Sequence, residues 1–126
     1  MVFGDGSAPD LKYADKVFQS LDVDEALVPA TWGLEVANVL TRAVLRGDAA
    51  IAETDRLIRT LLGLDIKTDA YTSDHALTDT LDLARRYNLS SYDASYLELA
   101  LRRSLPLATL DTSLRKAARK AGISPF

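Results

Sequence analysis

The sequence of 126 residues contains no cysteine and a single histidine, His75. The lack of cysteine excludes a disulfide framework, a zinc site built from thiolates and a cysteine nucleophile. A single histidine also excludes a metal site with several histidines and most histidine-based triads. No apolar run approaches the about 20 residues of a membrane-spanning helix, and the first residues lack the basic and apolar regions of a signal peptide. We therefore expect a cytoplasmic protein.

The composition is that of a soluble globular protein, with 48% hydrophobic and 26% charged residues. The length predicts a single domain over residues 1–126. The net charge of −3 gives no indication of nucleic-acid binding. Between residues 102 and 120, however, all charged residues except Asp111 are basic: Arg102, Arg103, Arg115, Lys116, Arg119 and Lys120. These residues form either a surface for an anionic partner or the solvated face of a helix whose dipole favours cations near its end.

Hydrophobic periodicity predicts short strands that alternate with amphipathic helices. The expected strands cover residues 26–29, 64–67 and 105–110, with an edge strand beginning at Ile123. The expected helices cover residues 9–21, 31–47, 48–63, 73–87, 90–103 and 112–120. This alternation is typical of an α/β fold with a short, mainly parallel sheet.

Cap residues and apolar stripes predict the ends and the core-facing sides of the second and third helices. Thr31 and Asp48 are the expected N-caps, and glycines are expected to end both helices. The expected core stripe of the second helix consists of Trp32, Val36, Val39, Leu40 and Ala43. That of the third consists of Ile51, Leu57, Ile58, Leu61 and Leu62.

Three carboxylates stand where such a sheet binds its ligands, beyond the carboxyl ends of the strands. Glu35 lies about one turn into the helix after the first predicted strand, and Asp93 lies in the first turn of a later helix. Asp111 directly follows the strand over residues 105–110. Carboxylates without histidine or cysteine suit Mg²⁺ or Mn²⁺. Such ions support hydrolysis of a phosphodiester, so this is the predicted chemistry.

Each acid also has a purely structural interpretation. Ser90 and Asp93 have the spacing of a capping box, and Asp111 is placed to cap the helix from Thr112. Glu35 borders an apolar stripe, where a carboxylate needs a partner, and an ion pair would explain it as well as a metal does. The sequence leaves both interpretations open for each residue.

The segments around these acids resemble the PIN-domain ribonucleases. Residues 28–40 are similar to the family segment that carries an acidic glutamate, and residues 89–100 to its second acidic helix. Residues 105–111 are similar to the following strand and its terminal aspartate. The likeness is greatest to the VapC-type toxins. It implies a three-layer α/β/α fold, a Mg²⁺- or Mn²⁺-dependent endoribonuclease that cleaves RNA, homodimers, and a cognate antitoxin. It also implies that Glu35, Asp93 and Asp111 are both the catalytic and the metal-binding residues.

The chain departs from the family at its beginning. The family has a central first strand that ends in another acidic aspartate, whereas residues 1–5 look like the end of the family's first helix. On that alignment the sheet lacks a central strand and the site lacks one carboxylate. We then expect either that the natural protein starts further upstream or that it is a degenerate family member. A second alignment makes residues 2–4 a remnant strand and lets Asp5 supply the acid.

Several other residues have both a functional and a plainer structural interpretation. Arg102, Arg103, Arg115 and Lys116 flank the segments of Asp93 and Asp111, where they could hold RNA phosphates. Trp32, Tyr92 and Tyr96 could stack on bases, but at helical spacing they are more typical of a core. Thr109 could bond to a metal-binding carboxylate or simply suit its strand. His75 is expected to be exposed and without a catalytic role.

Two other functions remain alternatives to the nuclease. On the alignment that lacks the first acidic residue, the chain is instead a catalytically silent PIN scaffold that only binds a partner protein. An acidic receiver-like domain is a further alternative, but it would need paired acids at the first strand and a lysine at a late strand, and neither is evident.

Overall fold

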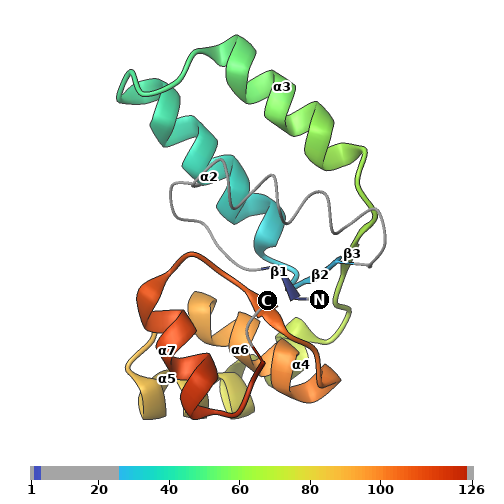
Figure 1. The fold of residues 1–126 in the computed structure, drawn as a ribbon, viewed down its shortest axis with the longest axis vertical. Helices are drawn as coiled ribbons and strands as arrows, with labels where there is room; N and C mark the ends of the chain where they lie inside the picture. The colour runs from blue at the N-terminus through green and yellow to red at the C-terminus, as the bar shows by residue number, and fades with distance from the viewer. Residues whose placement is uncertain (1, 4–25, 125–126) are drawn as a thin grey trace.

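The computed structural model describes residues 2–3 and 26–124. In these ranges four short strands form one parallel sheet with the order β3-β2-β1-β4. Figure 1 shows α2 and α3 on one side of the strands and the later helices on the other, which is the expected α/β/α arrangement. The helix expected over residues 9–21 lies outside the described residues.

The strands are β1 (Val2–Phe3), β2 (Ala26–Val28), β3 (Ile66–Thr68) and β4 (Leu107–Ala108). The last three overlap with predicted strands, although β3 is shifted relative to residues 64–67 and β4 is shorter than residues 105–110. Ile123 does not begin an edge strand. Instead, the backbone N–H of Leu107 donates to the carbonyl of Ser124 at 3.4 Å.

The expectation of a missing central strand is wrong, and β1 instead agrees with the second alignment, which makes residues 2–4 a remnant strand. Val2 pairs with Leu27 of β2 on one side and with Leu107 of β4 on the other. The centre of the sheet is therefore occupied, because an apolar pair such as Val2–Phe3 can lie between two parallel neighbours. Asp5, which the second alignment assigns to the site, lies outside the described residues.

The helices α2 (Trp32–Leu45) and α3 (Ile51–Leu62) extend away from the strands (Figure 1). All five residues of the expected α2 stripe are only half-buried. In α3, Leu57 and Leu61 are half-buried, but Ile51, Ile58 and Leu62 are exposed, which corrects the predicted stripe. The described elements leave that face of α3 uncovered, and an amphipathic pattern alone does not specify what covers it.

Two of the expected caps also differ from the structure. Ala50, not Asp48, occupies the N-cap of α3, and Asp48 lies in the preceding turn, where its carboxylate is 3.6 Å from Arg46. Thr31 occupies the N-cap of α2 but makes no capping hydrogen bond with its side chain. Gly63 ends α3 as expected.

The helix expected over residues 73–87 is present, but it changes its winding midway. It consists of α4 (Thr72–His75), a π-helical turn η1 (Ala76–Thr80) and α5 (Leu81–Tyr87). Asn88 follows in the left-handed conformation, with φ of 53°, which asparagine tolerates better than most residues.

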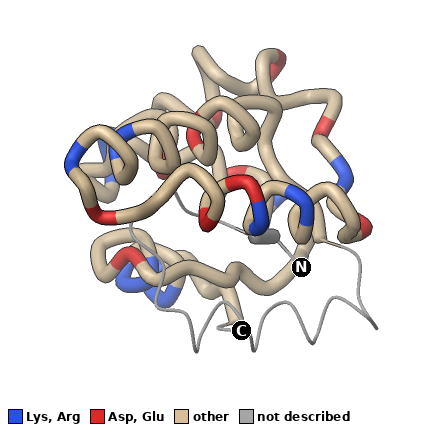
Figure 2. The backbone as a smooth tube through the Cα atoms, turned by 90° about the horizontal axis from the view of Figure 1, so that it is seen from above, with Lys and Arg blue, Asp and Glu red and all other residues tan. Residues whose placement is uncertain are grey.

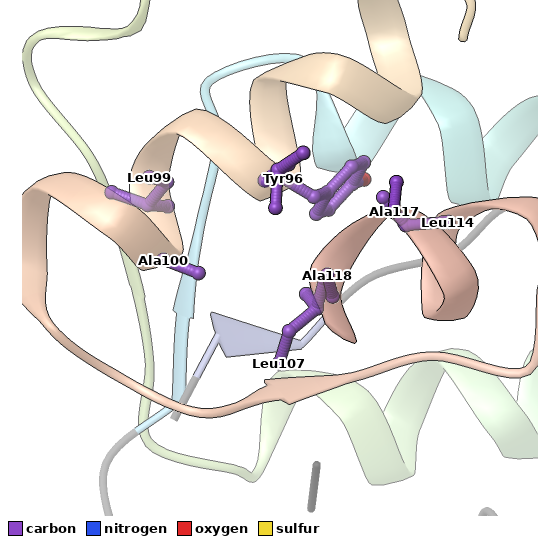
Figure 3. Close-up of a cluster of buried hydrophobic side chains, with 8 residues drawn as sticks. Tyr96, Leu99, Ala100, Leu107, Leu114, Ala117 and Ala118 are labelled. Carbon is purple, nitrogen blue, oxygen red and sulfur yellow. The ribbon is translucent and has the colours of Figure 1, made fainter. Parts of the chain in front are cut away.

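The core lies around α6 (Ser91–Arg103), in which every residue from Ala94 to Ala100 is buried. η1, α5, the strands β1 and β4, and α7 (Thr112–Lys120) pack against it. Figure 3 shows side chains of α6 facing those of α7 and β4. The buried cluster consists of Tyr96, Leu97, Leu99, Ala100, Leu107, Leu114, Ala117 and Ala118. Tyr96 is thus a core residue, whereas Tyr92 is 59% exposed.

Charged residues are spread over several elements. In Figure 2, Lys and Arg positions lie among Asp and Glu positions. Arg119 and Lys120 occupy the last turn of α7, where cations favour the helix dipole. None of the described helices is long and apolar enough to cross a membrane.

Candidate metal centre

Glu35 lies in the first turn of α2 and is half-buried. Both of its carboxylate oxygens accept hydrogen bonds. Thr31 Oγ1 donates to Oε1 at 2.9 Å, and the Tyr96 hydroxyl donates to Oε2 at 3.1 Å. These bonds satisfy a carboxylate that borders an apolar surface.

Asp93 lies in the first turn of α6 and is half-buried. Its backbone N–H donates to Ser90 Oγ at 3.1 Å, so the predicted cap at Ser90 is confirmed. This cap uses the backbone of Asp93 and leaves its carboxylate out of the bond. The structural role of the position is therefore compatible with a second role for the side chain.

Asp111 is the N-cap of α7, as the capping interpretation predicts. Its Oδ1 accepts from the backbone N–H of Leu114 at 2.7 Å. Thr109 is buried, and its Oγ1 accepts from the backbone N–H of Asp111 at 3.1 Å. Thr109 therefore orients the turn that carries Asp111 through the backbone of that residue.

The topology brings the segments of these three acids toward one edge of the sheet. Glu35 follows β2 and Asp111 follows β4, and these parallel strands flank β1. Tyr96 lies one turn after Asp93 on α6, so its bond to Glu35 joins the beginning of α6 to α2. That the three carboxylates share a metal ion stays a prediction.

A different group has the closest spacing of potential metal ligands in the described chain. It consists of His75, Asp79 and Glu98, whose ligand atoms all lie within 4.8 Å of one another. His75 Nδ1 is 3.0 Å from Asp79 Oδ2 and 3.6 Å from Glu98 Oε1. The side chain of His75 is only 28% exposed, so the expectation of an exposed histidine is wrong. Glu98 was not singled out from the sequence, because it lies within a helical apolar run.

Glu98 is already paired with Arg102, which also binds the buried Asp69. Arg102 Nε lies 2.7 Å from Glu98 Oε1, and Nη2 lies 2.6 Å from Asp69 Oδ2. Burial raises the pKa of Asp69, but hydrogen bonds and charge from Arg102 outweigh this and hold it below its ordinary value. Hydrogen bonds to Glu98 and then to Asp69 raise the pKa of Arg102.

Sequence reasoning missed this network, although one signal was present. Asp69 directly follows β3, the same position that drew attention to Asp111 after β4. Arg102 is therefore not available for RNA phosphates, which corrects that expectation. Arg115 Nη2 likewise donates to the carbonyl of Thr109 at 2.6 Å. Arg103 and Lys116 are exposed.

A surface cavity of about 450 Å³ borders the network. It is lined by His75, Asp79, Asp82, Leu83, Arg86, Glu98, Leu101 and Arg102. Its lining contains both acidic and basic side chains, and its most buried acid, Glu98, is bound by Arg102. The pairing of Glu98 with Arg102 and His75 therefore accounts for the most buried charge at this cavity.

Comparison with known proteins identifies both a family and a fold. The model of the PIN domain family matches residues 7–120. Among solved structures, the chain is similar to the crystal structure of PAE2754 from Pyrobaculum aerophilum, with a TM-score of 0.69 and 23% sequence identity. The match covers 92% of this chain and 78% of that chain, and at this identity it shows the fold alone. No curated protein matches the chain.

Proposed function

Since the chain belongs to the PIN domain family, we propose that it is an endoribonuclease that depends on Mg²⁺ or Mn²⁺. PIN domains are in general metal-dependent nucleases. The observation that carries the proposal is the placement of acids around β1: Glu35 follows β2, Asp111 follows β4, and Tyr96 ties the helix of Asp93 to Glu35. The assigned catalytic and metal-binding residues are Glu35, Asp93 and Asp111.

The donor chemistry of these residues fits a hard divalent ion. All three offer carboxylate oxygens, which Mg²⁺ and Mn²⁺ prefer. The cap bond of Asp111 uses Oδ1, and an ionised carboxylate has further lone pairs on both oxygens. Such an ion, when bound, neutralises phosphate charge and activates water for phosphodiester hydrolysis.

The chain's own residues contribute placement and charge. The caps at Ser90 and Asp111 fix the beginnings of α6 and α7, and thereby the backbones of two of the acids. Arg103 and Lys116 are exposed and are the remaining candidates to attract RNA phosphates. This attraction predicts RNA binding that weakens as salt rises.

The finer parts of the proposal concern partners. We expect the protein to act in the cytoplasm as the toxin of a toxin–antitoxin pair, as a homodimer that a cognate antitoxin neutralises. Ile51 and Leu62 on α3, and Leu34 and Leu45 on α2, are exposed apolar side chains that support burial against another chain.

The test combines metal binding with RNA cleavage by the full chain. Mn²⁺ is titrated calorimetrically into the wild type, Glu35→Gln, Asp93→Asn and Asp111→Asn, with Asp82→Asn on α5 as the matched control. We expect each site variant to weaken Mn²⁺ binding and abolish metal-dependent cleavage of RNA, while Asp82→Asn leaves both unchanged. Equal Mn²⁺ binding by the wild type and Asp93→Asn would refute the site. A wild type that binds Mn²⁺ without cleaving RNA would instead identify the catalytically silent scaffold.

The toxin role has a separate test in cells. Induced expression of the wild type should arrest growth, and Glu35→Gln at the same protein level should not. Growth arrest by both variants would show that the effect does not come from nuclease activity.

A further inference from the structure

Among the three assigned acids, Glu35 has its carboxylate held at both oxygens by hydroxyl groups. We propose that Thr31 and Tyr96 are positioning residues that fix this carboxylate for the divalent ion. The two hydroxyls are referred to as the Glu35 clamp. The inference rests on the proposed function, because it assumes that Glu35 binds a metal.

The clamp engages Glu35 from two separate parts of the chain. Thr31 Oγ1 donates to Oε1 at 2.9 Å from the residue before α2. The Tyr96 hydroxyl donates to Oε2 at 3.1 Å from α6, 61 residues further along. An ionised carboxylate only accepts hydrogen bonds, so both hydroxyls direct their protons toward Glu35.

The Thr31 side chain bonds to Glu35 and does not cap its helix. It occupies the N-cap position of α2, where a threonine side chain normally accepts a hydrogen bond from the helix backbone. Here its side chain makes no such bond, and its backbone is helical, with φ of −88° and ψ of −5°. The hydroxyl is used for the Glu35 carboxylate instead.

Tyr96 provides a rigid anchor. Its side chain is fully buried among the core residues of α6, α7 and β4 (Figure 3). Phenylalanine would fill the same apolar space, so packing does not require the hydroxyl, and the hydroxyl is the group that reaches Glu35. The position of the carboxylate is therefore tied to the core.

The clamp also relates Glu35 to a second assigned ligand. Asp93 lies three residues before Tyr96 on α6, so the two positions share a helix face. The bond from Tyr96 to Glu35 thus limits how far α2 and the beginning of α6 can separate. A metal ion that needs both acids would find them already restrained relative to each other.

Fixing a ligand in advance strengthens metal binding, because less freedom is lost when the ion binds. Each oxygen of Glu35 accepts one bond from the clamp and keeps a further lone pair for the ion. Loss of partners that orient metal ligands typically weakens affinity or activity by about 10- to 100-fold. We expect an effect of about tenfold for either hydroxyl alone.

The experiment measures Mn²⁺ affinity calorimetrically on the full chain, independently of RNA cleavage. Tyr96→Phe and Thr31→Val remove one hydroxyl each and should raise the Kd about tenfold. Thr31→Ser retains the hydroxyl and should restore wild-type affinity. Tyr92→Phe removes an exposed hydroxyl from the same helix and should change nothing. Circular dichroism verifies that each variant is folded.

A double-mutant cycle separates positioning from a general structural effect. In the Glu35→Gln background the clamp has no carboxylate to orient, so adding Tyr96→Phe should change the Kd by less than about twofold. If Tyr96→Phe weakens binding equally in both backgrounds, or leaves the Kd equal to that of Tyr92→Phe, the clamp is refuted. If Tyr96→Phe does not fold, the comparison of Thr31→Val with Thr31→Ser decides in the same way.

The outcomes distinguish this inference from the proposed function. If Glu35→Gln leaves Mn²⁺ affinity unchanged, Glu35 is not a ligand and the metal site of the proposed function fails with the clamp. If Glu35→Gln weakens binding and the hydroxyl variants do not, the clamp alone fails and the metal site stands.

Discussion

Replacing Arg102 with methionine removes the cation that two buried carboxylates share. Arg102 makes two hydrogen bonds to Asp69, at 3.1 and 2.6 Å, and two to Glu98, at 2.7 and 3.1 Å. Methionine retains much of the apolar stem, so the substitution mainly tests charge and hydrogen bonding. The variant leaves both acids buried without their cation.

The expected loss of stability follows from this imbalance. Removing one partner of a buried ion pair costs about 3–5 kcal/mol, because the remaining charge is uncompensated. The Arg102 side chain is 20% exposed, so water reaches the network and we expect the lower end, about 3 kcal/mol. Arg103→Met alters the exposed neighbouring arginine and should stay within about 0.5 kcal/mol of the wild type.

The stability difference between the wild type and Arg102→Met should depend on pH in a defined direction. In the wild type the pKa of Asp69 is lowered, so its contribution to stability is fully present above its unfolded pKa and is lost as pH falls through the folded pKa. In Arg102→Met, Asp69 stays buried without its cation, so its pKa is expected to rise. Protonation of Asp69 then stabilises the folded variant as pH falls. The stability difference between the two proteins should therefore shrink from pH 7 toward pH 4.

The assay is urea unfolding followed by circular dichroism at several pH values, with the free energy of unfolding compared at unchanged m-value. Arg102→Met no less stable than Arg103→Met at pH 7 would refute the argument. A difference that stays constant or grows toward pH 4 would show that the destabilisation does not come from the uncompensated carboxylates.

Three further predictions concern the core, the cap of α7 and the exposed face of α3. Leu114→Ala truncates a fully buried side chain and should cost about 2–5 kcal/mol of unfolding free energy, measured by urea denaturation, and a cost near zero would contradict the core assignment. Asp111→Ala should lower the free energy of unfolding by about 1 kcal/mol, because the cap of α7 is lost. Asp111→Asn keeps an oxygen that can accept the cap bond, so it should reduce Mn²⁺ affinity, measured by calorimetry, without reducing stability. Leu62→Ser alters an exposed residue of α3 and should change monomer stability by less than about 0.5 kcal/mol while weakening self-association in sedimentation experiments. Unchanged self-association would exclude α3 from a dimer interface.

Local features of the fold were predictable from the sequence because their causes lie within a few residues. Ser90 and Asp111 were predicted as caps, and both side chains accept the expected backbone hydrogen bonds. The family segments around Glu35, Asp93 and Asp111 were also recognisable, and the match to the PIN domain family agrees with them. Capping, periodicity and short motifs depend on neighbouring residues, which the sequence lists in order.

Predictions from the sequence were wrong where a residue's partner is distant in the chain or where the hydrophobic pattern is weak. Val2–Phe3 is too short for periodicity to identify, and its role as a strand comes from β2 and β4 on its two sides. Ile51 and Leu62 have the spacing of core residues, but the described chain leaves them exposed. Periodicity states which residues share a face, and only packing determines what that face meets.

The sequence by itself determined the family and the alternation of strands and helices, and it pointed to the three acids that we propose as metal ligands. The tertiary structure alone decided that Arg102 serves Asp69 and Glu98 rather than an RNA phosphate, and that Tyr96 reaches Glu35 across 61 residues. The physical reason is range: backbone propensity acts between neighbours in the chain, whereas a hydrogen bond between buried side chains exists only once distant elements have packed.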